Sequence, residues 1–234
     1  MLFNLLLQIA ETGAQNVENT ADAETTEKTL SIFQLYVEGG LWIMIPLTIM
    51  SIIAVYIFVE RYMAIQKASK LDPDFMNQIK NQIIQGKIEE AKNTCLRSDN
   101  PRARMIEKGI SRIGKPLSDI SAAIENVGKL EVFKLEKSLS SLATIAGAAP
   151  MIGFLGTVVG MIMTFHQMSI SGNGVEISEL SGGIMMAMVT TVAGLIVGII
   201  AYVAYNQLVA KVSKVVFSLE ATTVEFMDLL QEPA

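Results

Sequence analysis

The chain has 234 residues and a mass of 25.4 kDa, enough for one modest domain or two small ones. Apolar residues make up 51% of it and charged residues only 18%, with a formal net charge of -5 and a pI near 5.0. This acidic balance gives no basic footprint for nucleic acid. One histidine and one cysteine exclude a Cys/His metal cluster and an internal disulfide.

Charged residues are absent from three long windows of the sequence. These windows are 39–59 with 21 residues, 138–175 with 38 residues and 180–210 with 31 residues. A soluble fold mixes charge along every amphipathic element, whereas an apolar run beyond about 18 residues is long enough to cross a membrane. The sequence therefore predicts an all-α integral membrane protein with three transmembrane helices.

The first window predicts a transmembrane helix over 39–60. Trp42 at one end and Tyr56 near the other match the aromatic belts of membrane interfaces. The second window predicts a helix over 138–168 with a polar lead-in, and Pro150 predicts a kink where its buried section begins. The third window predicts a transmembrane helix over 180–210, so that 169–179 form a short turn.

The basic residues predict one orientation for all three helices. One basic residue stands against six acidic residues before residue 41, but 15 stand against ten between Arg61 and Lys137. The positive-inside rule therefore places 61–137 and the C-terminal helix 211–234 in the cytoplasm. It places the N-terminal segment 1–38 and the turn 169–179 on the outer, periplasmic side.

The first dozen residues have two interpretations. They resemble the core of a signal peptide, but they lack a basic flank and are interrupted by Asn4 and Gln8. We therefore expect an amphipathic helix lying on the outer face of the membrane rather than a cleaved signal. The acidic stretch 13–29 predicts a loose tether.

The cytoplasmic segment is helical in pattern. Helix starts are expected after the pairs Asp72-Pro73 and Asn100-Pro101, at Lys87, and after Pro116, with stops at Gly86 and Gly114. From Ile120 to Gln167 only Pro150 interrupts the pattern, which predicts one very long helix that leaves the membrane. The third transmembrane helix is likewise expected to continue to Leu229. The second and third helices would thus both extend far into the cytoplasm.

Small residues form a stripe on each of the second and third helices. In the second helix they are Gly153, Gly156, Thr157, Gly160 and Thr164; in the third they are Gly183, Ala187, Thr191, Gly194, Gly198 and Ala201. Steps of three or four place each set on one side of its helix. In lipid such faces mark close helix contacts, so the glycines and alanines predict tight packing or the lining of a pore.

Two hydroxyl groups lie in the middle of these stripes. Thr157 and Thr191 either bond to their own helix backbone, as buried threonines usually do, or line a polar path as a proton relay. None of the three spans contains Asp, Glu, Lys or Arg, and His166 lies at an outer end, where an interfacial position is favoured over a proton shuttle. If the chain moves protons, a partner must supply the titrating group.

The stripes also contain two family motifs. The second helix reads Gly153-Phe-Leu-Gly-Thr-Val-Val-Gly-Met161, preceded by Ala149-Pro150, and the third reads Gly183-Ile-Met-Met-Ala-Met-Val-Thr-Thr-Val-Ala-Gly-Leu195. Both resemble the MotA/TolQ/ExbB family of proton-channel subunits, whose strings run like APxxGLLGTVxGM and GIxxALxTTxxGL. Glu60-Arg61 resembles the family's exit from its first span. Three spans with the large loop after the first are similar to ExbB and TolQ rather than to the four-span MotA.

The resemblance implies an assembly in the bacterial inner membrane. Family members form a homopentameric ring around a dimer of ExbD-type or TolR-type partners, each with a single span that carries an intramembrane aspartate. Protons load and leave that aspartate opposite the pore threonines, which fall on Thr157 and Thr191 here. In ExbB systems a TonB-like transducer carries the work to outer-membrane receptors. Protons are then the driving ion, and no cofactor or metal is expected.

Two positions depart from the family pattern. ExbB and TolQ often have tryptophan where this chain has Val159, and ExbB types often have glutamate where it has Met186. These departures weaken the assignment to the TonB branch but leave the proton-motor class intact. The alternatives are a TolQ-like subunit of an envelope-maintenance motor and a passive scaffold that clamps partner helices. A membrane enzyme is disfavoured, because the spans show no nucleophile–base pair.

Overall fold

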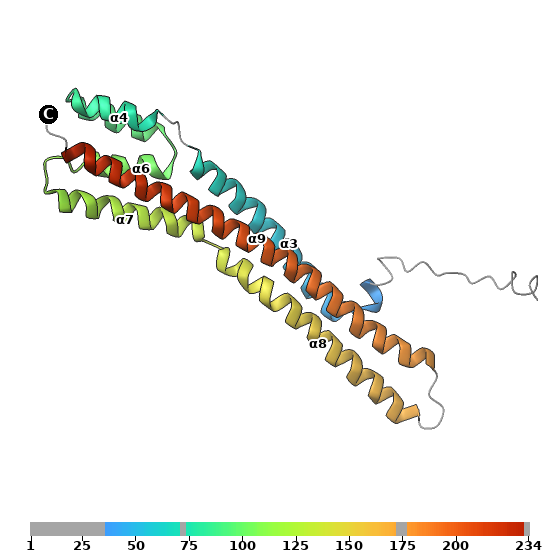
Figure 1. Cartoon of the computed structure of the whole chain (residues 1–234). Coiled ribbons are helices and arrows are strands. Elements are labelled where there is room, and N and C mark those ends of the chain that lie inside the picture. Colours follow the sequence, from blue (N-terminus) through green and yellow to red (C-terminus); the bar gives the residue numbers. More distant parts are fainter. Residues whose placement is uncertain (1–35, 71–73, 172–176, 232–234) are drawn as a thin grey trace, which may run out of the picture. The chain divides into compact units, whose positions relative to one another are not determined.

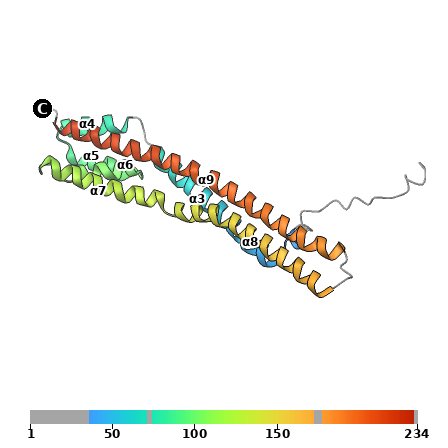
Figure 2. The same ribbon diagram turned by 60° about the horizontal axis from the view of Figure 1, so that its bottom comes forward.

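In the computed structural model the described residues are 36–70, 74–171 and 177–231, and they form seven helices of ten residues or more (Figures 1 and 2). The helices are α3 (Leu41–Ser69), α4 (Phe75–Ile84), α5 (Ile88–Arg97), α6 (Pro101–Ile110), α7 (Leu117–Glu136), α8 (Leu139–Ser171) and α9 (Ile177–Gln231). The amphipathic helix and tether expected within residues 1–29 lie outside the described residues. Of the turn expected at 169–179, residues 172–176 lie outside them too, while α8 extends to Ser171 and α9 begins at Ile177.

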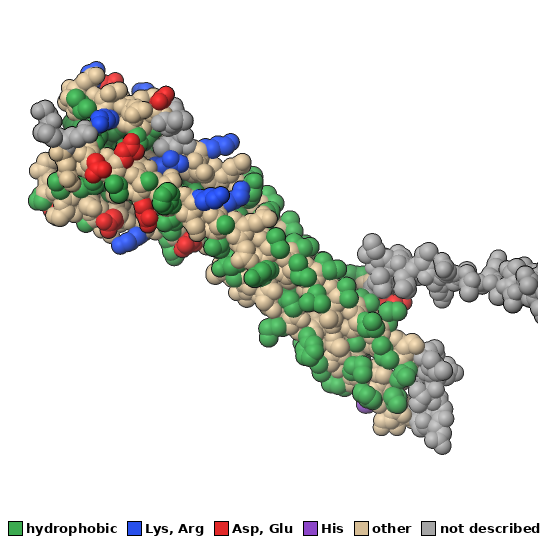
Figure 3. Space-filling view, viewed as in Figure 1, with side chains coloured by type: hydrophobic (Ala, Val, Ile, Leu, Met, Phe, Trp, Pro, Cys, Tyr) green, Lys and Arg blue, Asp and Glu red, His purple; other side chains and the backbone are tan. Residues whose placement is uncertain are grey.

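Three stretches of the described chain are long and apolar enough to cross a membrane. They are Leu41–Ser69, Leu117–Ile170 and Leu180–Gln231. The last two contain the helices expected at 138–168 and 180–210, and the first covers the helix expected at 39–60 except for its first two residues. The expectation of an all-helical multi-pass membrane protein is therefore confirmed. Figure 3 shows hydrophobic side chains covering the surface along α8 and the first part of α9, while charged side chains gather at the other end.

The helices α8 and α9 form an antiparallel pair. Gly153 lies against Gly194, and towards the turn that joins the two helices Gly160 lies against Gly183. The helix α3 packs along the same pair, where Leu47 of α3 and Ala149 of α8 share one buried cluster. Pro46 is accommodated near the start of α3, and Pro150 lies inside α8 with Gly198 against its ring.

The expectation of one unbroken helix from Ile120 to Gln167 is wrong. The helix α7 ends at Glu136 and α8 begins at Leu139, because Ser138 takes a left-handed backbone conformation with φ of 69°. In a continuous helix the Lys134 carbonyl would accept a bond from the amide of Ser138. Instead it accepts a hydrogen bond from Arg61 Nη1 at 2.9 Å. A side chain distant in sequence thus replaces the bond that the break removes.

The helix that contains the third expected transmembrane span, α9, does continue beyond that span as expected. The helix α9 runs without interruption from Ile177 to Gln231, and its later part packs against α4, α6 and α7. We call α4 to α7, together with α9 from Lys211 onward, the charged half. Its core is apolar and includes Ile79 of α4, Ile106 of α6 and Phe226 of α9, which are all fully buried.

The buried Asn100 joins the end of α3 to the charged half. Its Oδ1 accepts a hydrogen bond from the backbone amide of Arg102, so Asn100 caps α6, with Pro101 in the first helical position. Its Nδ2 donates to the carbonyls of Ala68 at 3.1 Å and Lys70 at 2.7 Å, which belong to the end of α3. One side chain thereby ties the exit of the first apolar helix to the start of α6.

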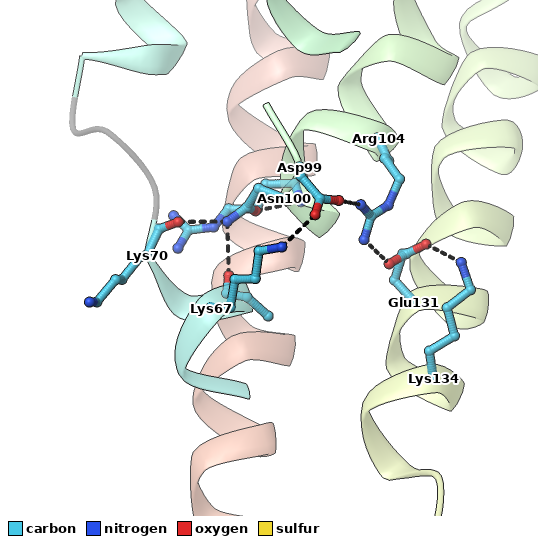
Figure 4. A network of polar contacts seen from close by, with 9 residues as sticks. Lys67, Lys70, Asp99, Asn100, Arg104, Glu131 and Lys134 are labelled. Carbon is cyan, nitrogen blue, oxygen red and sulfur yellow. Dashed lines mark hydrogen bonds and ion pairs between the residues drawn. The ribbon is translucent and has the colours of Figure 1, made fainter. Parts of the chain in front are cut away.

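A chain of alternating charges continues from this junction to α7 (Figure 4). Lys67 pairs with Asp99 at 2.6 Å, Asp99 with Arg104 at 2.8 Å, and Arg104 with Glu131 at 2.5 Å. Lys134 completes the chain on the other oxygen of Glu131 at 2.7 Å. Glu131 is its buried member, with a side chain 5% exposed, so its two partners compensate for the water that it loses.

Replacing Glu131 with glutamine is expected to destabilise the charged half at neutral pH by about 1 to 2 kcal/mol, because Arg104 and Lys134 would lose a buried, charged partner. Burial alone would raise the pKa of Glu131, but the hydrogen bonds from Arg104 and Lys134 outweigh it and hold that pKa below its ordinary 4.5. The carboxylate therefore contributes its stability above about pH 4.5 and loses it as the pH falls through the lower, folded-state pKa. The difference between the native chain and Glu131→Gln should narrow in acid.

The single cysteine, Cys95, can report the unfolding of the charged half and so test the Glu131→Gln prediction. Cys95 is buried in the core, and burial raises the pKa of its thiol to about 12. A pulse of 4,4′-dithiodipyridine, which reacts with thiols in acid, therefore reports when α4 to α6 open in urea. Glu125→Gln on the exposed face of α7 is the control and should leave the urea midpoint unchanged. An equal shift at every pH in Glu131→Gln would contradict the pairing.

Candidate functional site

The predicted small-residue stripes face each other in the α8–α9 pair. A Cβ added at Gly194 would lie 2.6 Å from the Ala149 carbonyl oxygen and 2.8 Å from the Cα of Gly153. A Cβ at Gly160 would lie 2.8 Å from the Gly183 carbonyl oxygen and 3.1 Å from the side chain of Ala187. The backbones therefore touch along this seam, which only residues without side-chain bulk allow.

Two hydroxyl groups meet at the middle of the seam. The Oγ1 atoms of Thr157 on α8 and Thr191 on α9 are hydrogen-bonded to each other. Both atoms also lie 3.2 Å from the carbonyl oxygen of Ala187, and Thr191 Oγ1 lies 3.4 Å from that of Gly153. The structure thus brings together the two threonines singled out in the sequence, across a helix contact and not only within their own helices.

This arrangement gives each hydroxyl a choice of partners. A threonine hydroxyl has one proton to donate and lone pairs to accept, so one threonine donates to the other while the second donates to a carbonyl. Reversing the direction of that bond leaves every acceptor within reach. Thr157 and Thr191 are both only half-buried, so a group brought against this face can reach them. Such a pair can accept a proton from one side and release one on the other.

Two further threonines pack the seam instead of facing outward. Thr164 is buried against Gly183 and donates to the Gly160 carbonyl at 2.9 Å. Thr190 is fully buried and donates to the carbonyls of Met186 and Ala187, each at 3.0 Å.

Thr190 was missed in the sequence, where only its neighbour Thr191 stood out. A Cβ at Gly156 would lie 2.4 Å from Thr190 Oγ1, so this glycine makes the room that Thr190 occupies. The signal was the Thr-Thr doublet, whose two side chains must point in different directions on a helix. One hydroxyl fills the contact with α8, and the other takes part in the pair.

Ionisable groups lie away from the threonine pair. The apolar parts of α8 and α9 carry no Asp, Glu, Lys or Arg, and His166 lies exposed towards the turn between them. Among the described residues no group of three or more His, Cys, Asp or Glu side chains is placed to hold a metal ion. The described part of this chain thus places no carboxylate or amine in the apolar windows that hold Thr157 and Thr191.

The predicted Glu60-Arg61 exit of the first helix is a structural junction. Arg61 is buried and donates to both oxygens of Glu60, through Nε at 3.1 Å and through Nη2. Its third bond goes to the Lys134 carbonyl at the end of α7. One residue on, the ammonium of Lys211 from α9 lies 3.9 Å from the centre of the Tyr62 ring. The end of the apolar part of α3 is thus fixed to α7 and to α9.

Together, the fold and the site define a multi-pass membrane protein in which two glycine-packed helices hold a pair of hydroxyl groups. The sequence model of the MotA/TolQ/ExbB proton channel family matches residues 97–221, which include the α8–α9 seam and both threonines. The chain therefore belongs to that family and is a proton channel subunit, not an enzyme.

Several similar proteins have names that contain the words biopolymer transport protein, and three of them illustrate the similarity. One from Synechocystis, named ExbB-like 3, is 30% identical over 166 residues, covering 69% of this chain and 77% of that protein. ExbB of Aquifex aeolicus is 39% identical over 111 residues, covering 47% of this chain and 74% of ExbB. An ExbB homologue from Methanothermobacter thermautotrophicus is 24% identical over 194 residues, covering 81% of this chain and 67% of that protein.

Proposed function

We propose that this chain is the ring-forming subunit of a proton-motive-force-driven motor in the bacterial inner membrane. In this proposal five copies surround ExbD-type partners, each with a single span that carries an aspartate. Thr157 and Thr191 form the proton path, and the partner's aspartate titrates beside them. The observation that carries the proposal is the half-buried hydroxyl pair on an apolar helix seam that has no carboxylate of its own.

The chemistry of the pair supports this division between two polypeptides. Proton pathways in membranes normally depend on an intramembrane carboxylate or its equivalent. Hydroxyl groups relay protons but do not hold a charge near neutral pH, so a ring with threonines alone has no loading step. A partner carboxylate supplies that step. Each proton that crosses 100 mV then releases ~2.3 kcal/mol, so a few protons per step suffice to break weak protein contacts.

The remaining site residues have packing roles in the proposal. Glycines and small residues hold α8 and α9 together, or line the pore beside the threonines; they are Gly153, Gly156, Gly160, Thr164, Gly183, Ala187, Gly194 and Gly198. Pro150 kinks α8, and Glu60 with Arg61 marks the cytoplasmic exit of α3. The excess of basic residues in 61–137 supports an orientation with the charged half in the cytoplasm and the α8–α9 turn in the periplasm.

Reconstitution tests the proposal. The purified chain alone, in liposomes with an imposed membrane potential and a trapped pH-sensitive dye, is expected to conduct protons no faster than empty liposomes. The complex with its single-span partner should conduct, and replacing the partner's aspartate with asparagine should stop conduction. Fast, voltage-driven acidification by this chain alone would contradict the division between ring and partner.

In this proposal the motor drives TonB-dependent outer-membrane transport. The ExbB names of the Synechocystis and Aquifex proteins favour this branch. A protein named TolQ from Pseudomonas aeruginosa is also similar, at 32% identity over 112 residues, and keeps the TolQ-like alternative open. Uptake of TonB-dependent substrates in cells that lack this chain distinguishes the two: lost uptake supports the ExbB-like function, whereas normal uptake with a leaky envelope supports the TolQ-like one.

A further inference from the structure

A groove lies between α7 and α9 in the charged half, away from the threonine pair. Its volume is about 780 Å³, and its floor is apolar, with Val132 from α7, Leu219 from α9 and Met105 from α6. A Cβ at Gly128 would lie 2.9 Å from Met105 Cε, so this glycine lets the methionine reach the floor. Phe133 stands at the edge with 72% of its surface exposed.

The groove is acidic, although the segment around it is basic. Four of its lining residues are acids and one is a base: Glu125, Glu136, Glu220 and Asp228, with Lys129. All five are exposed, and within the described residues none of the four carboxylates forms an ion pair. By contrast, 61–137 as a whole contains 15 basic and ten acidic residues. An apolar floor with unpaired acids at its edge suits a basic, amphipathic segment.

The groove also continues the face of α9 that carries Thr191. Because α9 is one unbroken helix with 3.6 residues per turn, Glu220 and Met227 follow Thr191 by about eight and ten full turns. Both residues line the groove. A partner helix that runs along α9 at Thr191 therefore points towards the groove at the other end of the same face.

From these observations we infer that the groove binds a basic, amphipathic segment of the single-span partner, the segment next to its membrane helix on the cytoplasmic side. The inference rests on the proposed function. The positive-inside rule makes this flank of the partner rich in lysine and arginine, which the four acids complement. Its apolar side covers the floor, as in other helix-in-groove contacts.

The distances set the length of that segment. Glu220 lies about 44 Å along α9 from Thr191, and half of the hydrocarbon core takes up about 15 Å of this. The partner must span the remaining distance, about 29 Å. A helix of about 20 residues or an extended stretch of about nine reaches that far.

Photo-crosslinking of the intact complex tests the inference. Phe133→p-benzoylphenylalanine places the crosslinker at the groove, and the same change at Leu130 is the control, because Leu130 lies on α7, is 61% exposed and does not line the groove. Ultraviolet light is expected to join position 133, but not position 130, to a lysine- and arginine-rich peptide of the partner. Mass spectrometry identifies that peptide.

Charge reversal adds a second readout. The pair Glu220→Lys and Asp228→Lys should lower the crosslink yield at least about tenfold, while Glu225→Lys, an exposed α9 position outside the groove, should not. A crosslink from position 133 only to another copy of this chain, only to lipid, or to nothing would overturn the inference. Co-purification of the partner separates these results from a failure of the proposed function, in which no partner is bound at all.

Discussion

Replacing Thr157 with valine is expected to reduce proton-driven transport at least about 100-fold while the complex still assembles. Valine keeps the shape of threonine but can neither donate nor accept the bond with Thr191. A positioned group that transfers a proton typically raises the rate by a factor of about 100 to 10,000. The expected loss of proton-driven transport takes its size from the lower end of this range. Thr191→Val removes the other half of the pair and should have the same effect.

Conservative variants separate a relay from a packing role. Thr157→Ser keeps a hydroxyl within reach of Thr191 and should retain most of the transport. The control is Thr164→Val, because the Thr164 hydroxyl bonds only to the Gly160 carbonyl of its own helix. That variant should conduct protons at nearly the native rate.

The measurements are dye-reported proton flux in liposomes and the amount of partner that co-purifies. Near-native flux in both Thr157→Val and Thr191→Val would rule out the relay and favour the passive scaffold. Loss of the partner in these variants would instead place the two hydroxyls in assembly. Native assembly with lost flux is the result that the geometry predicts.

Local sequence signals predicted most helix boundaries in this chain. Asn100 before Pro101 marked the start of α6, and Pro116 stands directly before α7. The continuation of α9 into the charged half followed from the lack of Gly or Pro between Gly198 and Pro233, together with its apolar spacing. These features could be predicted because each depends on residues within one or two turns of the helix end.

The break between α7 and α8 could not be predicted in the same way. No glycine or proline stands at Ser138, and the carbonyl freed by the break is satisfied by Arg61, which is 73 residues away in the sequence. Serine before an apolar run is a moderate sign of a helix start. The backbone carbonyl of Ser138 does accept the first hydrogen bond of α8, from the amide of Leu142. Only the folded structure shows that a new helix does start after Ser138.

The sequence identified the residues of the candidate site but not which residues of α8 lie opposite which residues of α9. Spacing alone placed Thr157 and Thr191 in the middle of two small-residue faces. It did not show which residues oppose each other, because that depends on how far α8 and α9 slide along their contact. The structure fixes the register through Gly153 against Gly194, and this register joins the two threonines and buries Thr190.

Gly194→Ala is therefore expected to be the most damaging small substitution in the apolar helices. Its Cβ would lie within 2.8 Å of two backbone atoms of α8, the Ala149 carbonyl oxygen and the Gly153 Cα, and neither can move without the whole helix. Overpacking of this kind typically costs about 1 to 3 kcal/mol. Separation of the helices would also pull Thr157 from Thr191, so proton flux should be lost together with stability.

Gly147→Ala is the matched control on the same helix pair. Gly147 is also helical, in α8, but nothing lies within 4 Å of the position its Cβ would take. Alanine favours a helix over glycine by up to about 1 kcal/mol, so this variant should be as stable as the native chain or more stable. Both variants add one methyl group to a helical glycine, so the difference between them isolates the helix contact.

Thermal unfolding of the purified protein in detergent, followed by circular dichroism, measures the first effect, and dye-reported proton flux of the complex measures the second. Gly194→Ala should melt several degrees below the native chain and conduct poorly, whereas Gly147→Ala should match the native chain in both. Equal melting temperatures for the two variants would mean that α8 and α9 do not pack through Gly153 and Gly194. A stable Gly194→Ala protein that has lost flux would mean that the seam tolerates the methyl group but the threonine pair does not tolerate the displacement.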